Sequence, residues 1–472
     1  MALVFLTRSN LTASSSYTHP GWNDRINVEI WLPLDNWNGR FQGVGGGGYR
    51  TGSGPPSLVV PINDGYSAAY TDGGHSIESA NAASPANWAL LSPGNLNYPL
   101  LQDFAAVALA DMALLGKAIT ESYYGQKPDY SYWTGCSTGG RQGLMLAQRY
   151  PDLYDGIVAL APAVNWDTFL VTEFWVQQFM NELGAYPPPC EIQAFTKAAV
   201  TACDKLDGLK DGVISNATAC QFDPHSVVGT HFSCGNDTAQ FTHEGALVVE
   251  AAWTGPIDSQ GTRQWYGLGK DANLSALVQT VPATGNSSAK GVPQMYAPDW
   301  IKYFVAKDPD LDIGNLSNEE YFRILHLSRN EFRSILGTSD PDLSPFKARG
   351  GKMITWHGLA DQLIFPNGSV DYYQRVSEEV SDVQDFYRFF EAPGVAHCSG
   401  GAGAQPVGEL EALVQWVEHG VAPETLAATN VTLNGAKPGP GESLPKRKIC
   451  AWPKEQKYSG GDPLVAESFD CV

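Results

Sequence analysis

The strand, turn and helix predicted over 130–149 constrain the fold more than any other segment of the chain. The apolar and aromatic run at 130–134 is typical of a buried strand, and residues 140–149 are typical of a helix. Between them lies Gly135-Cys136-Ser137-Thr138-Gly139, whose small residues permit a sharp turn that lifts a serine Oγ clear of the sheet's carboxyl edge. An ordinary glycine-rich connection between a strand and a helix is the alternative interpretation.

Strands alternate with helices on both sides of this turn. The period-two apolar pattern over 25–33 predicts a strand with one buried face, and another short strand is predicted to end near Gln42. Helices are also predicted over 103–122, 370–380 and 407–418, and strands over 156–160, 352–356 and 385–390. Because this alternation is typical of a parallel sheet, the sequence predicts an α/β fold with a mostly parallel, doubly wound sheet.

The alternation stops after Pro162 and returns near residue 350. In between, Asn, Thr, Ser, Gly and Trp accumulate, and four of the eight cysteines occur there. A chain of 472 residues also exceeds the roughly 250–300 residues at which a single core stops growing. We therefore expect a core formed by residues 1–162 and 346–472, an inserted domain at 163–345, and an irregular tail beyond Pro438.

Composition and charge argue against several classes of protein. Lys and Arg number 30 against 50 Asp and Glu, and the resulting net charge of −20 disfavours binding to nucleic acid. No apolar run approaches the ~18 residues of a membrane span. The cysteines form no C-x-x-C pair and no H-E-x-x-H motif accompanies them, which argues against a zinc site.

The cysteines and sequons indicate an oxidising compartment. An even number of cysteines fits disulfides, and N-x-[ST] sequons recur along the chain, as in glycoproteins of the secretory pathway. The stretch from Met1 to Ser9 is too short in apolar residues for a convincing signal peptide. We therefore expect this chain to be a fragment of a secreted protein.

An acid and a histidine follow Ser137 in a fixed chain order. Asp361 follows the predicted strand at 352–356 and His397 follows the next predicted strand, which is the Ser, Asp, His order of α/β-hydrolases. A neutral serine is a poor nucleophile, so His397 would remove its proton and Asp361 would orient and stabilise the imidazolium. His357 is the competing base, and we interpret it as a structural hydrogen-bonding residue because it precedes the acid.

Two cysteines flank this candidate triad. Cys136 immediately precedes Ser137, and Cys398 immediately follows His397. If the hydroxyl and the imidazole lie within hydrogen-bond reach of about 2.6–3.2 Å, the neighbouring Cα atoms come close enough for a disulfide, usually below ~7 Å. The sequence thus predicts a Cys136–Cys398 bond. The rival hypothesis makes Cys136 the nucleophile of a cysteine hydrolase, but this disulfide would silence it.

Acyl transfer by this triad also needs donors for the oxyanion. The N–H of Thr138 is one donor by position, and Gly46 or Gly47 in the glycine run at 45–48 is the expected second. A flexible loop is the alternative interpretation of that run. Aromatic residues of the insertion are candidates for stacking on an aromatic acyl group, although core packing is their more common role. They are Phe174, Trp175 and Trp253.

These motifs together resemble the tannase/feruloyl esterase family of secreted α/β-hydrolases. The resemblance is carried by Cys136-Ser137, Asp361 and His397-Cys398, and by the run Gly-Cys-Ser-Thr-Gly-Gly-Arg-Gln-Gly at 135–143, and it extends from about Ile26 to Val472. It implies an α/β-hydrolase core with an inserted lid, in agreement with the insertion at 163–345. It also implies esters of hydroxylated aromatic acids as substrates.

The insertion contains an acidic, glycine-containing segment at 203–214. Its three carboxylates can wrap a hard cation, with backbone carbonyls completing the shell, although a solvated acidic turn is the alternative. The family resemblance favours a structural Ca²⁺. Carried over by position, the ligands are Asp204, Asp207 and Asp211 and the main-chain oxygens of Leu209 and Val213. A Cys203–Cys220 bond would close this loop, which leaves Cys190–Cys234 in the insertion and Cys450–Cys471 in the tail.

The sequence therefore predicts a secreted serine carboxylesterase that hydrolyses feruloyl or related hydroxycinnamoyl esters of plant cell-wall sugars. A tannase that acts on galloyl esters is the nearest alternative. A non-catalytic glycan- or partner-binding protein with a hydrolase fold is the alternative from another class. The expected partner is a small aromatic ester or a feruloylated oligosaccharide, with no nucleic acid and no membrane, and the chain is expected to act as a monomer or homodimer.

Overall fold

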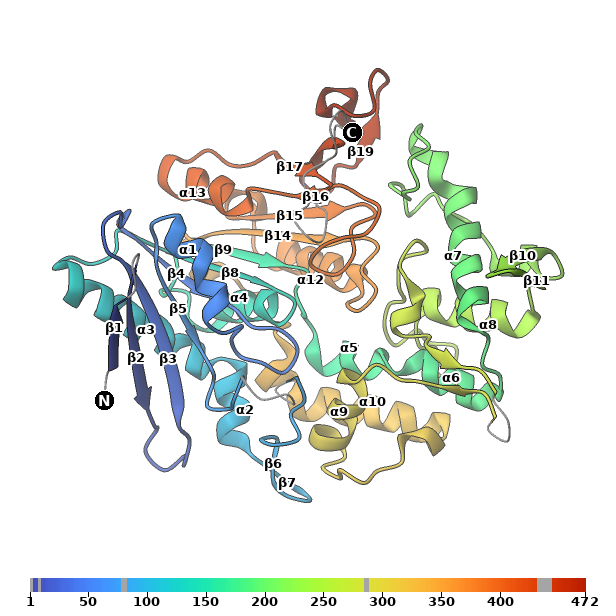
Figure 1. The fold of residues 1–472 in the computed structure, drawn as a ribbon, viewed down its shortest axis with the longest axis horizontal. Coiled ribbons are helices and arrows are strands. Elements are labelled where there is room, and N and C mark those ends of the chain that lie inside the picture. The colour runs from blue at the N-terminus through green and yellow to red at the C-terminus, as the bar shows by residue number, and fades with distance from the viewer. Residues whose placement is uncertain (1–2, 7–9, 78–82, 284–287, 431–443) are drawn as a thin grey trace.

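A nine-stranded sheet crosses the middle of the molecule (Figure 1). The computed structural model describes residues 3–6, 10–77, 83–283, 288–430 and 444–472. In spatial order the strands are β1 (Leu3–Leu6), β2 (Asn10–Tyr17), β3 (Ile26–Pro33), β5 (Ser67–Thr71), β4 (Arg40–Val44), β8 (Tyr130–Cys136), β9 (Gly156–Leu160), β14 (Lys352–Gly358) and β15 (Tyr387–Ala392).

The sheet is parallel over most of its width. Every neighbouring pair from β5 through β4, β8, β9 and β14 to β15 is parallel, whereas β1, β2, β3 and β5 pair in antiparallel register. Parallel strands with crossover helices leave their carboxyl ends at one edge, where loops from distant parts of the sequence meet. The prediction of a mostly parallel sheet is confirmed.

Helices cover both faces of the sheet. Adjacent residues of each strand point to opposite sides, so each strand supplies apolar side chains to both faces. On one face Phe41, Trp133, Ile157 and Phe389 pack against side chains of α3 (Val107–Tyr124), α4 (Thr138–Arg149) and α12 (Pro366–Glu379). On the other face Tyr132, Val158, Trp356 and Phe390 pack against α13 (Glu409–His419). The short α1 (Val59–Asn63) contacts β3 and β5.

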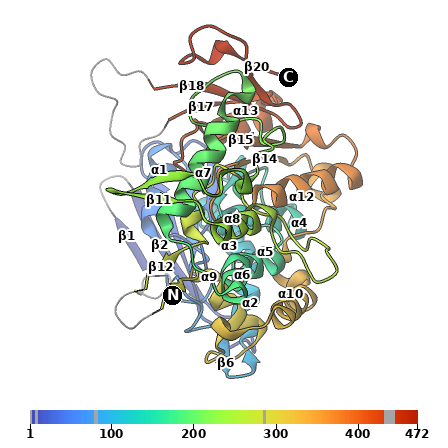
Figure 2. The ribbon, with the colours of Figure 1, turned by 90° about the vertical axis from the view of Figure 1, so that its right-hand side faces the viewer.

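Residues 161–351 add no strand to the nine-stranded sheet, in the part of this segment that the structure describes. Helices dominate here, and they lie beside the sheet in Figure 1 and face the viewer in Figure 2. They are α5 (Trp166–Thr172), α6 (Trp175–Leu183), α7 (Pro189–Cys203), α8 (His243–Thr254), α9 (Tyr296–Asp299), α10 (Asn318–Phe332) and α11 (Ser344–Ala348). Two hairpins accompany them, namely β10 (His231–Cys234) with β11 (Asp237–Gln240), and β12 (Thr280–Val281) with β13 (Lys290–Gly291).

The largest apolar cluster joins this helical segment to the sheet-forming part of the chain. Trp166, Trp300 and Phe304 of the segment pack in one cluster with Tyr49 and Phe104, which precede it in the sequence. The helical segment is therefore packed firmly against the loops at the carboxyl edge.

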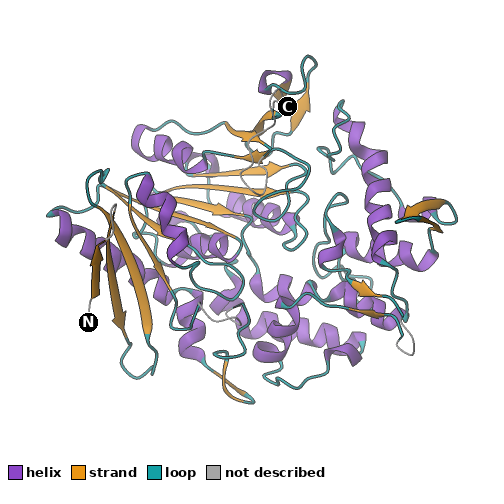
Figure 3. Ribbon diagram, viewed as in Figure 1, coloured by secondary structure: helices purple, strands orange, loops and turns teal. Residues whose placement is uncertain are grey.

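The C-terminal tail differs from the expected irregular chain. Strand β18 (Lys446–Cys450) pairs with β17 (Thr425–Thr429), which pairs with β16 (Gln405–Pro406), and β19 (Gln456–Tyr458) pairs with β20 (Phe469–Cys471) (Figure 3). The prediction of an irregular tail beyond Pro438 is wrong for β18, β19 and β20, whose short pairing segments carry too weak a period-two pattern to be recognised alone.

The helix predicted over 103–122 is two helices in the structure. The first, α2 (Tyr98–Ala105), begins after Asn97, whose side chain accepts a hydrogen bond from the Leu100 N–H, and Ala106 with φ of −163° separates it from α3. Just before α2 the chain also forms a small hairpin, β6 (Leu90–Ser92) with β7 (Asn95–Leu96). In the described chain no single helix is long and apolar enough to span a membrane, and only the pair α2 and α3, bent by 57°, passes that test together.

Candidate active site

Ser137 occupies a strained turn between β8 and α4. Its φ of 64° and ψ of −122° lie in a region that side-chain-bearing residues rarely adopt. A Cβ on Gly135 would lie 2.5 Å from the carbonyl carbon of Gly139, so the turn closes only because glycine stands at this position. The Ser137 N–H donates to the Leu160 carbonyl at 3.0 Å. The sequence thus fixes a sharp elbow at the carboxyl edge of the sheet.

Asp361 and His397 form a close pair beside this elbow. His397 Nδ1 lies 2.7 Å from Asp361 Oδ2, and the other oxygen, Oδ1, accepts the N–H groups of Leu363 at 2.8 Å and Ile364 at 2.9 Å. Burial alone raises the pKa of Asp361, but the charge and hydrogen bonds of the neighbouring histidines hold this pKa below its usual range. The buried carboxylate therefore stays ionised and fixes the imidazole ring.

His357 contacts the same carboxylate and lies outside the cavity lining. Its Nε2 is 3.0 Å from Asp361 Oδ2 and 3.2 Å from the Ile364 carbonyl oxygen, and its Nδ1 is 2.8 Å from Ser369 Oγ. Two acceptors at Nε2 assign the proton to that nitrogen, which leaves Nδ1 to accept from the Ser369 hydroxyl. The fully buried His357 is thus a hydrogen-bonding residue, as its position before the acid suggested.

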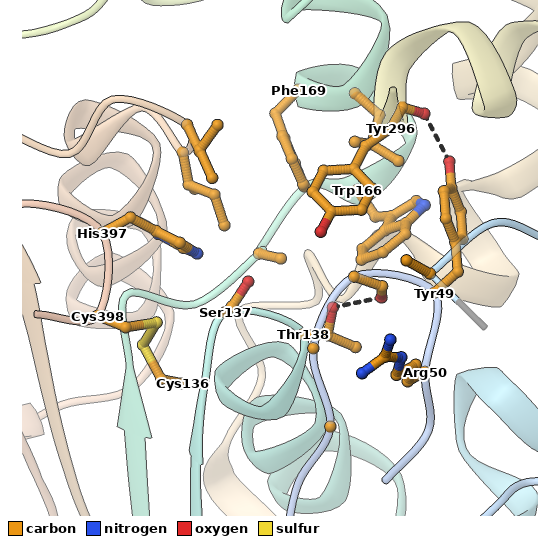
Figure 4. Close-up of a pocket in the computed structure, with 18 of the residues that line it drawn as sticks. Tyr49, Arg50, Cys136, Ser137, Thr138, Trp166, Phe169, Tyr296, His397 and Cys398 are labelled. Atoms are coloured by element: carbon orange, nitrogen blue, oxygen red, sulfur yellow. Dashed lines mark hydrogen bonds between the residues drawn. A yellow bond between two sulfur atoms is a disulfide. The ribbon is translucent and has the colours of Figure 1, made fainter. Parts of the chain in front are cut away.

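A disulfide joins the two sides of the site. Cys136 and Cys398 are bonded, with their Cα atoms 5.9 Å apart and 262 residues between them in the sequence. In Figure 4 the Ser137 hydroxyl and the His397 ring point into the same space on the cavity side of this bond. The bond ties the end of β8 to the loop that follows β15.

Ser137 and His397 lie in a cavity of about 430 Å³ whose far walls are aromatic. Tyr49, Trp166, Phe169 and Tyr296 line it, and the Tyr49 hydroxyl donates to the Tyr296 carbonyl at 2.8 Å (Figure 4). The size and lining suit one aromatic ring with a short substituent.

Some backbone N–H groups at the cavity have no acceptor among the residues that the structure describes, and two of them stand at positions considered for the oxyanion. They belong to Gly47 and Thr138, which both line the cavity. The N–H of Gly46 differs, because it donates to Gln142 Oε1 at 3.0 Å. Of the two glycines considered from the sequence, Gly47 therefore has the N–H that is free to bind an oxyanion.

Glu173 adds a carboxyl group to the cavity wall. Its side chain is only 3% exposed, and its Oε2 has no hydrogen-bond partner within the described residues. Burial raises the pKa of Glu173 well above its usual value, and the nearby negative charge of Asp361 raises it further. Burial thus favours the protonated form of Glu173, which can both donate and accept a hydrogen bond.

Comparison with known protein families identifies the family of this chain. The family profile described as tannase and feruloyl esterase matches residues 11–472. The chain belongs to the tannase and feruloyl esterase family.

Individual relatives agree with this assignment. A probable feruloyl esterase from Arthroderma benhamiae is 42% identical over 461 residues, which is 96% of this chain and 84% of the relative. The solved tannin acyl hydrolase from Aspergillus niger superposes with a TM-score of 0.89 at 28% identity, covering 100% of this chain and 90% of the other. Feruloyl esterase B from Aspergillus oryzae gives a TM-score of 0.81 at 26% identity, covering 98% and 90%. These likenesses confirm the α/β-hydrolase fold.

The remaining cysteines of this tannase and feruloyl esterase family member are bonded in the pairs expected from the sequence. These pairs are Cys190–Cys234, Cys203–Cys220 and Cys450–Cys471. Cys203–Cys220 spans the acidic segment, as a loop closure would.

The carboxylates of that segment turn toward its own backbone. Asp204 Oδ1 accepts the N–H groups of Asp211 and Gly212, each at 3.0 Å, and Asp207 Oδ1 accepts the Leu209 N–H at 3.0 Å. Asp211 accepts the Val213 N–H at 3.3 Å through Oδ1 and contacts Arg447 Nη2 at 3.2 Å through Oδ2. Burial raises the pKa of Asp211, an effect that Arg447 opposes and the Asp207 charge reinforces.

The aromatic residues considered from the sequence do not form the cavity wall. Phe174 and Trp175 are buried in the large apolar cluster, and Trp253 lines a separate depression. The cavity instead uses Tyr49, directly after the glycine run, and Trp166, shortly after β9. The sequence analysis missed Tyr49, Trp166 and Glu173. The available signal was that Tyr49 follows the glycine run and Trp166 follows the strand predicted at 156–160.

The Cys136–Cys398 bond should support both stability and the reactivity of Ser137. In a Cys136→Ser/Cys398→Ser double variant we expect the free energy of unfolding to fall by roughly 2–4 kcal/mol. Labelling of Ser137 by a serine-directed phosphonate should slow at least tenfold, because the strained elbow and the His397 loop lose their tether. Thermal denaturation and labelling rates measure the two effects.

A Cys450→Ser/Cys471→Ser variant is the matched control, since that disulfide lies outside the cavity lining. It should lose stability without slower labelling. Wild-type labelling by the Cys136→Ser/Cys398→Ser protein would contradict the positioning role of the bond.

Proposed function

We propose that this family member is a secreted serine carboxylesterase that hydrolyses feruloyl and related hydroxycinnamoyl esters of plant cell-wall sugars. One observation carries the proposal: Ser137 and the Asp361-oriented His397 meet in a cavity that is walled by aromatic residues. An ester carbonyl held beside Ser137 leaves its aromatic acyl group against those walls.

The proposed reaction passes through an acyl-enzyme. His397 accepts the proton of the Ser137 hydroxyl as Oγ attacks the ester carbonyl, and Asp361 stabilises the imidazolium that forms. The tetrahedral intermediate collapses when His397 gives this proton to the leaving alcohol. Water activated by His397 then attacks the acyl-enzyme, releases the aromatic acid and restores Ser137.

The N–H groups of Thr138 and Gly47 are the proposed oxyanion donors. Their lack of other acceptors supports this role, because donors that are already oriented and unpaired stabilise developing charge without reorganisation. Gly46 is not proposed, since Gln142 holds its N–H.

We further propose that residues 163–345 act as the lid and substrate-specificity domain, while 1–162 and 346–472 form the catalytic core. Trp166, Phe169, Glu173 and Tyr296, all from the insertion, supply most of the wall opposite the nucleophile. The buried carboxyl of Glu173 is the proposed partner of a ring hydroxyl on the acyl group, since its Oε2 has no hydrogen-bond partner among the described residues.

Relatives support the feruloyl preference over the galloyl one. The 42% identical relative is a probable feruloyl esterase, whereas a tannase from Aspergillus oryzae is 29% identical. Hydrolysis of galloyl esters remains the second candidate, because the solved tannin acyl hydrolase superposes with the higher TM-score. The four disulfides support an extracellular location, where such bonds persist.

A structural Ca²⁺ in the acidic loop is part of the proposal. Asp204, Asp207 and Asp211, with the carbonyl oxygens of Leu209 and Val213, offer the all-oxygen donor set that calcium prefers. Asp204 and Asp207 are buried, and each has one oxygen engaged by backbone N–H groups, which orients the other for a cation. The ion would hold the loop closed and would take no part in the chemistry.

Hydrolysis of a matched panel of esters tests the function. We expect turnover of methyl ferulate, caffeate, p-coumarate and sinapate with little turnover of methyl gallate, measured by release of the acid. Ser137→Ala should lower kcat by at least about 10⁴-fold because the nucleophile is lost.

Turnover confined to gallate would move the assignment to a tannase. A well-folded protein that neither turns over the panel nor reacts with a serine-directed phosphonate would leave the non-catalytic binding role.

A second experiment tests Glu173. In Glu173→Leu, which removes both donor and acceptor, kcat/KM for methyl p-coumarate should fall about tenfold while methyl cinnamate, which has no ring hydroxyl, is unaffected. Glu173→Gln keeps a neutral donor and acceptor and should retain activity on both. Equal losses on the two esters in Glu173→Leu would show that Glu173 only supports packing.

Chelation tests the calcium loop. Removing Ca²⁺ with EGTA should lower the melting temperature by a few degrees, and added Ca²⁺ should restore it, because an ion that binds only the folded state stabilises it. Asp207→Asn should abolish this response. An unchanged melting temperature of the wild-type protein in EGTA would argue against the ion.

A further inference from the structure

A second cluster of charged side chains lies outside the catalytic cavity. His19 and Asp24 belong to the connection between β2 and β3, Asp103 to α2 and Asp111 to α3, the elements at the N-terminal side of the sheet in Figure 1. None of these four residues lines the cavity that contains Ser137. The proposed reaction gives this cluster no role.

Three side chains of the cluster bring ligand atoms to one point. His19 Nδ1 lies 2.6 Å from Asp24 Oδ2 and 3.8 Å from Asp103 Oδ1, and one ligand atom of each residue lies within 4.8 Å of the others. Ligands around a tetrahedral Zn²⁺ with bonds of 2.0–2.1 Å are roughly 3.3 Å apart. The two distances from Nδ1 bracket this value, so small rotations of the side chains would admit the ion.

The other atoms of two ligands are already held in place. His19 Nε2 lies 3.0 Å from Asp111 Oδ2, and the Tyr17 hydroxyl donates to that same oxygen at 2.8 Å. Asp24 Oδ1 accepts from Thr18 Oγ1 and from the His19 N–H, both at 2.7 Å. A histidine that donates one ring N–H to a carboxylate presents its other nitrogen as a metal ligand, and this arrangement is typical around bound metals.

Asp103 is the observation that points to a missing ligand. Its side chain is fully buried, and neither carboxylate oxygen has a hydrogen-bond partner among the described residues. Buried carboxylates are normally paired or bound to metals, since an unpaired buried charge is costly. Asp103 instead faces His19 Nδ1, 3.8 Å from its Oδ1, and the carboxylate of Asp24, to which it can hydrogen-bond only when it carries a proton.

We propose that His19 Nδ1, Asp24 Oδ2 and the carboxylate of Asp103 bind one divalent transition-metal ion such as Zn²⁺. One imidazole and two carboxylates suit zinc or manganese better than calcium, which prefers an all-oxygen shell. Two carboxylates and a neutral imidazole also balance the charge of the ion. The side chain of His19 is 23% exposed, which gives the ion and a completing water a path from solvent.

The ion would join the β2–β3 connection to the break between α2 and α3. Phe104 and Ala105, the two residues after Asp103, accept hydrogen bonds from the buried guanidinium of Arg141 in α4, each at 3.1 Å. Helix α4 begins directly after Ser137. The site therefore stabilises the support of the nucleophile helix and does not contact substrate.

Metal binding is tested on full-length protein that has been stripped with a chelator and re-equilibrated with Zn²⁺ or Mn²⁺. Elemental analysis should find one ion per chain, and the melting temperature should rise with the ion. Both effects should vanish in His19→Gln and Asp103→Asn. Asp111→Asn should bind 10–100-fold more weakly, as measured by calorimetry, because it removes the group that orients the ring.

Two controls separate this site from others. His225 pairs with Glu250 at 3.1 Å on the surface, so His225→Gln removes a histidine and carboxylate pair of ordinary type and should keep the ion. Asp207→Asn removes the proposed calcium ligand and should also keep it. Neither result depends on esterase activity, so the test stands apart from the proposed function.

A proton on Asp103 is the competing occupant, since burial raises the pKa of this carboxyl to about 8. In that case Asp103→Asn would raise the melting temperature while the wild-type protein bound no ion. That outcome, or equal metal content in wild type and His19→Gln, would overturn the proposal. The His19→Gln and Asp111→Asn variants keep the test decisive if Asp103→Asn does not fold.

Discussion

The Cys136–Cys398 bond holds together two strained turns on which the site depends. Ser137 has a φ of 64° and Cys398 a φ of 60°, so residues with side chains occupy the left-handed region at or next to the proposed nucleophile and base. Such conformations persist only where the surroundings over-determine them. Here Gly135 and Gly139 close the first turn, and the disulfide fixes the first turn to the second across 262 residues.

Two buried charged groups at the carboxyl edge, Asp361 and Arg141, are stabilised because each has hydrogen-bond partners that suit the sign of its charge. Asp361 is surrounded by donors from two histidines and two backbone N–H groups. Arg141, equally buried, donates to the carbonyls of Phe104 and Ala105 and to Thr338 Oγ1, and burial lowers the pKa of its guanidinium to about 9. Arg141 thus connects α4 to α2 and to the insertion, while Asp361 holds His397 at the sheet edge.

The sequence was sufficient to predict an element or a site residue wherever it contained a strong local pattern or a fixed order of motifs along the chain. The strand at 156–160 matches β9, and the Ser137, Asp361 and His397 order placed three distant residues at one sheet edge because parallel strands share that edge. The break at Ala106 was invisible, since the apolar pattern continues through it. The position of Glu173 in the cavity wall and the contacts of His19 with Asp103 depend on residues far apart in the sequence. No rule based on sequence spacing predicts such contacts.

The proposed division of labour between sheet and insertion agrees with a family that contains both tannases and feruloyl esterases. The proposed nucleophile, base and acid follow the ends of sheet strands, where a change of side chain disturbs strained turns and buried charge. Trp166, Phe169 and Glu173 lie on or directly after α5, in a segment whose core merges with Tyr49 and Phe104. Substitutions there can reshape the acyl pocket while Ser137 and His397 keep their positions. We therefore infer that acyl preference within this fold varies through residues of the insertion, and that the glycine run and the disulfide-linked turns constrain how far the insertion can move.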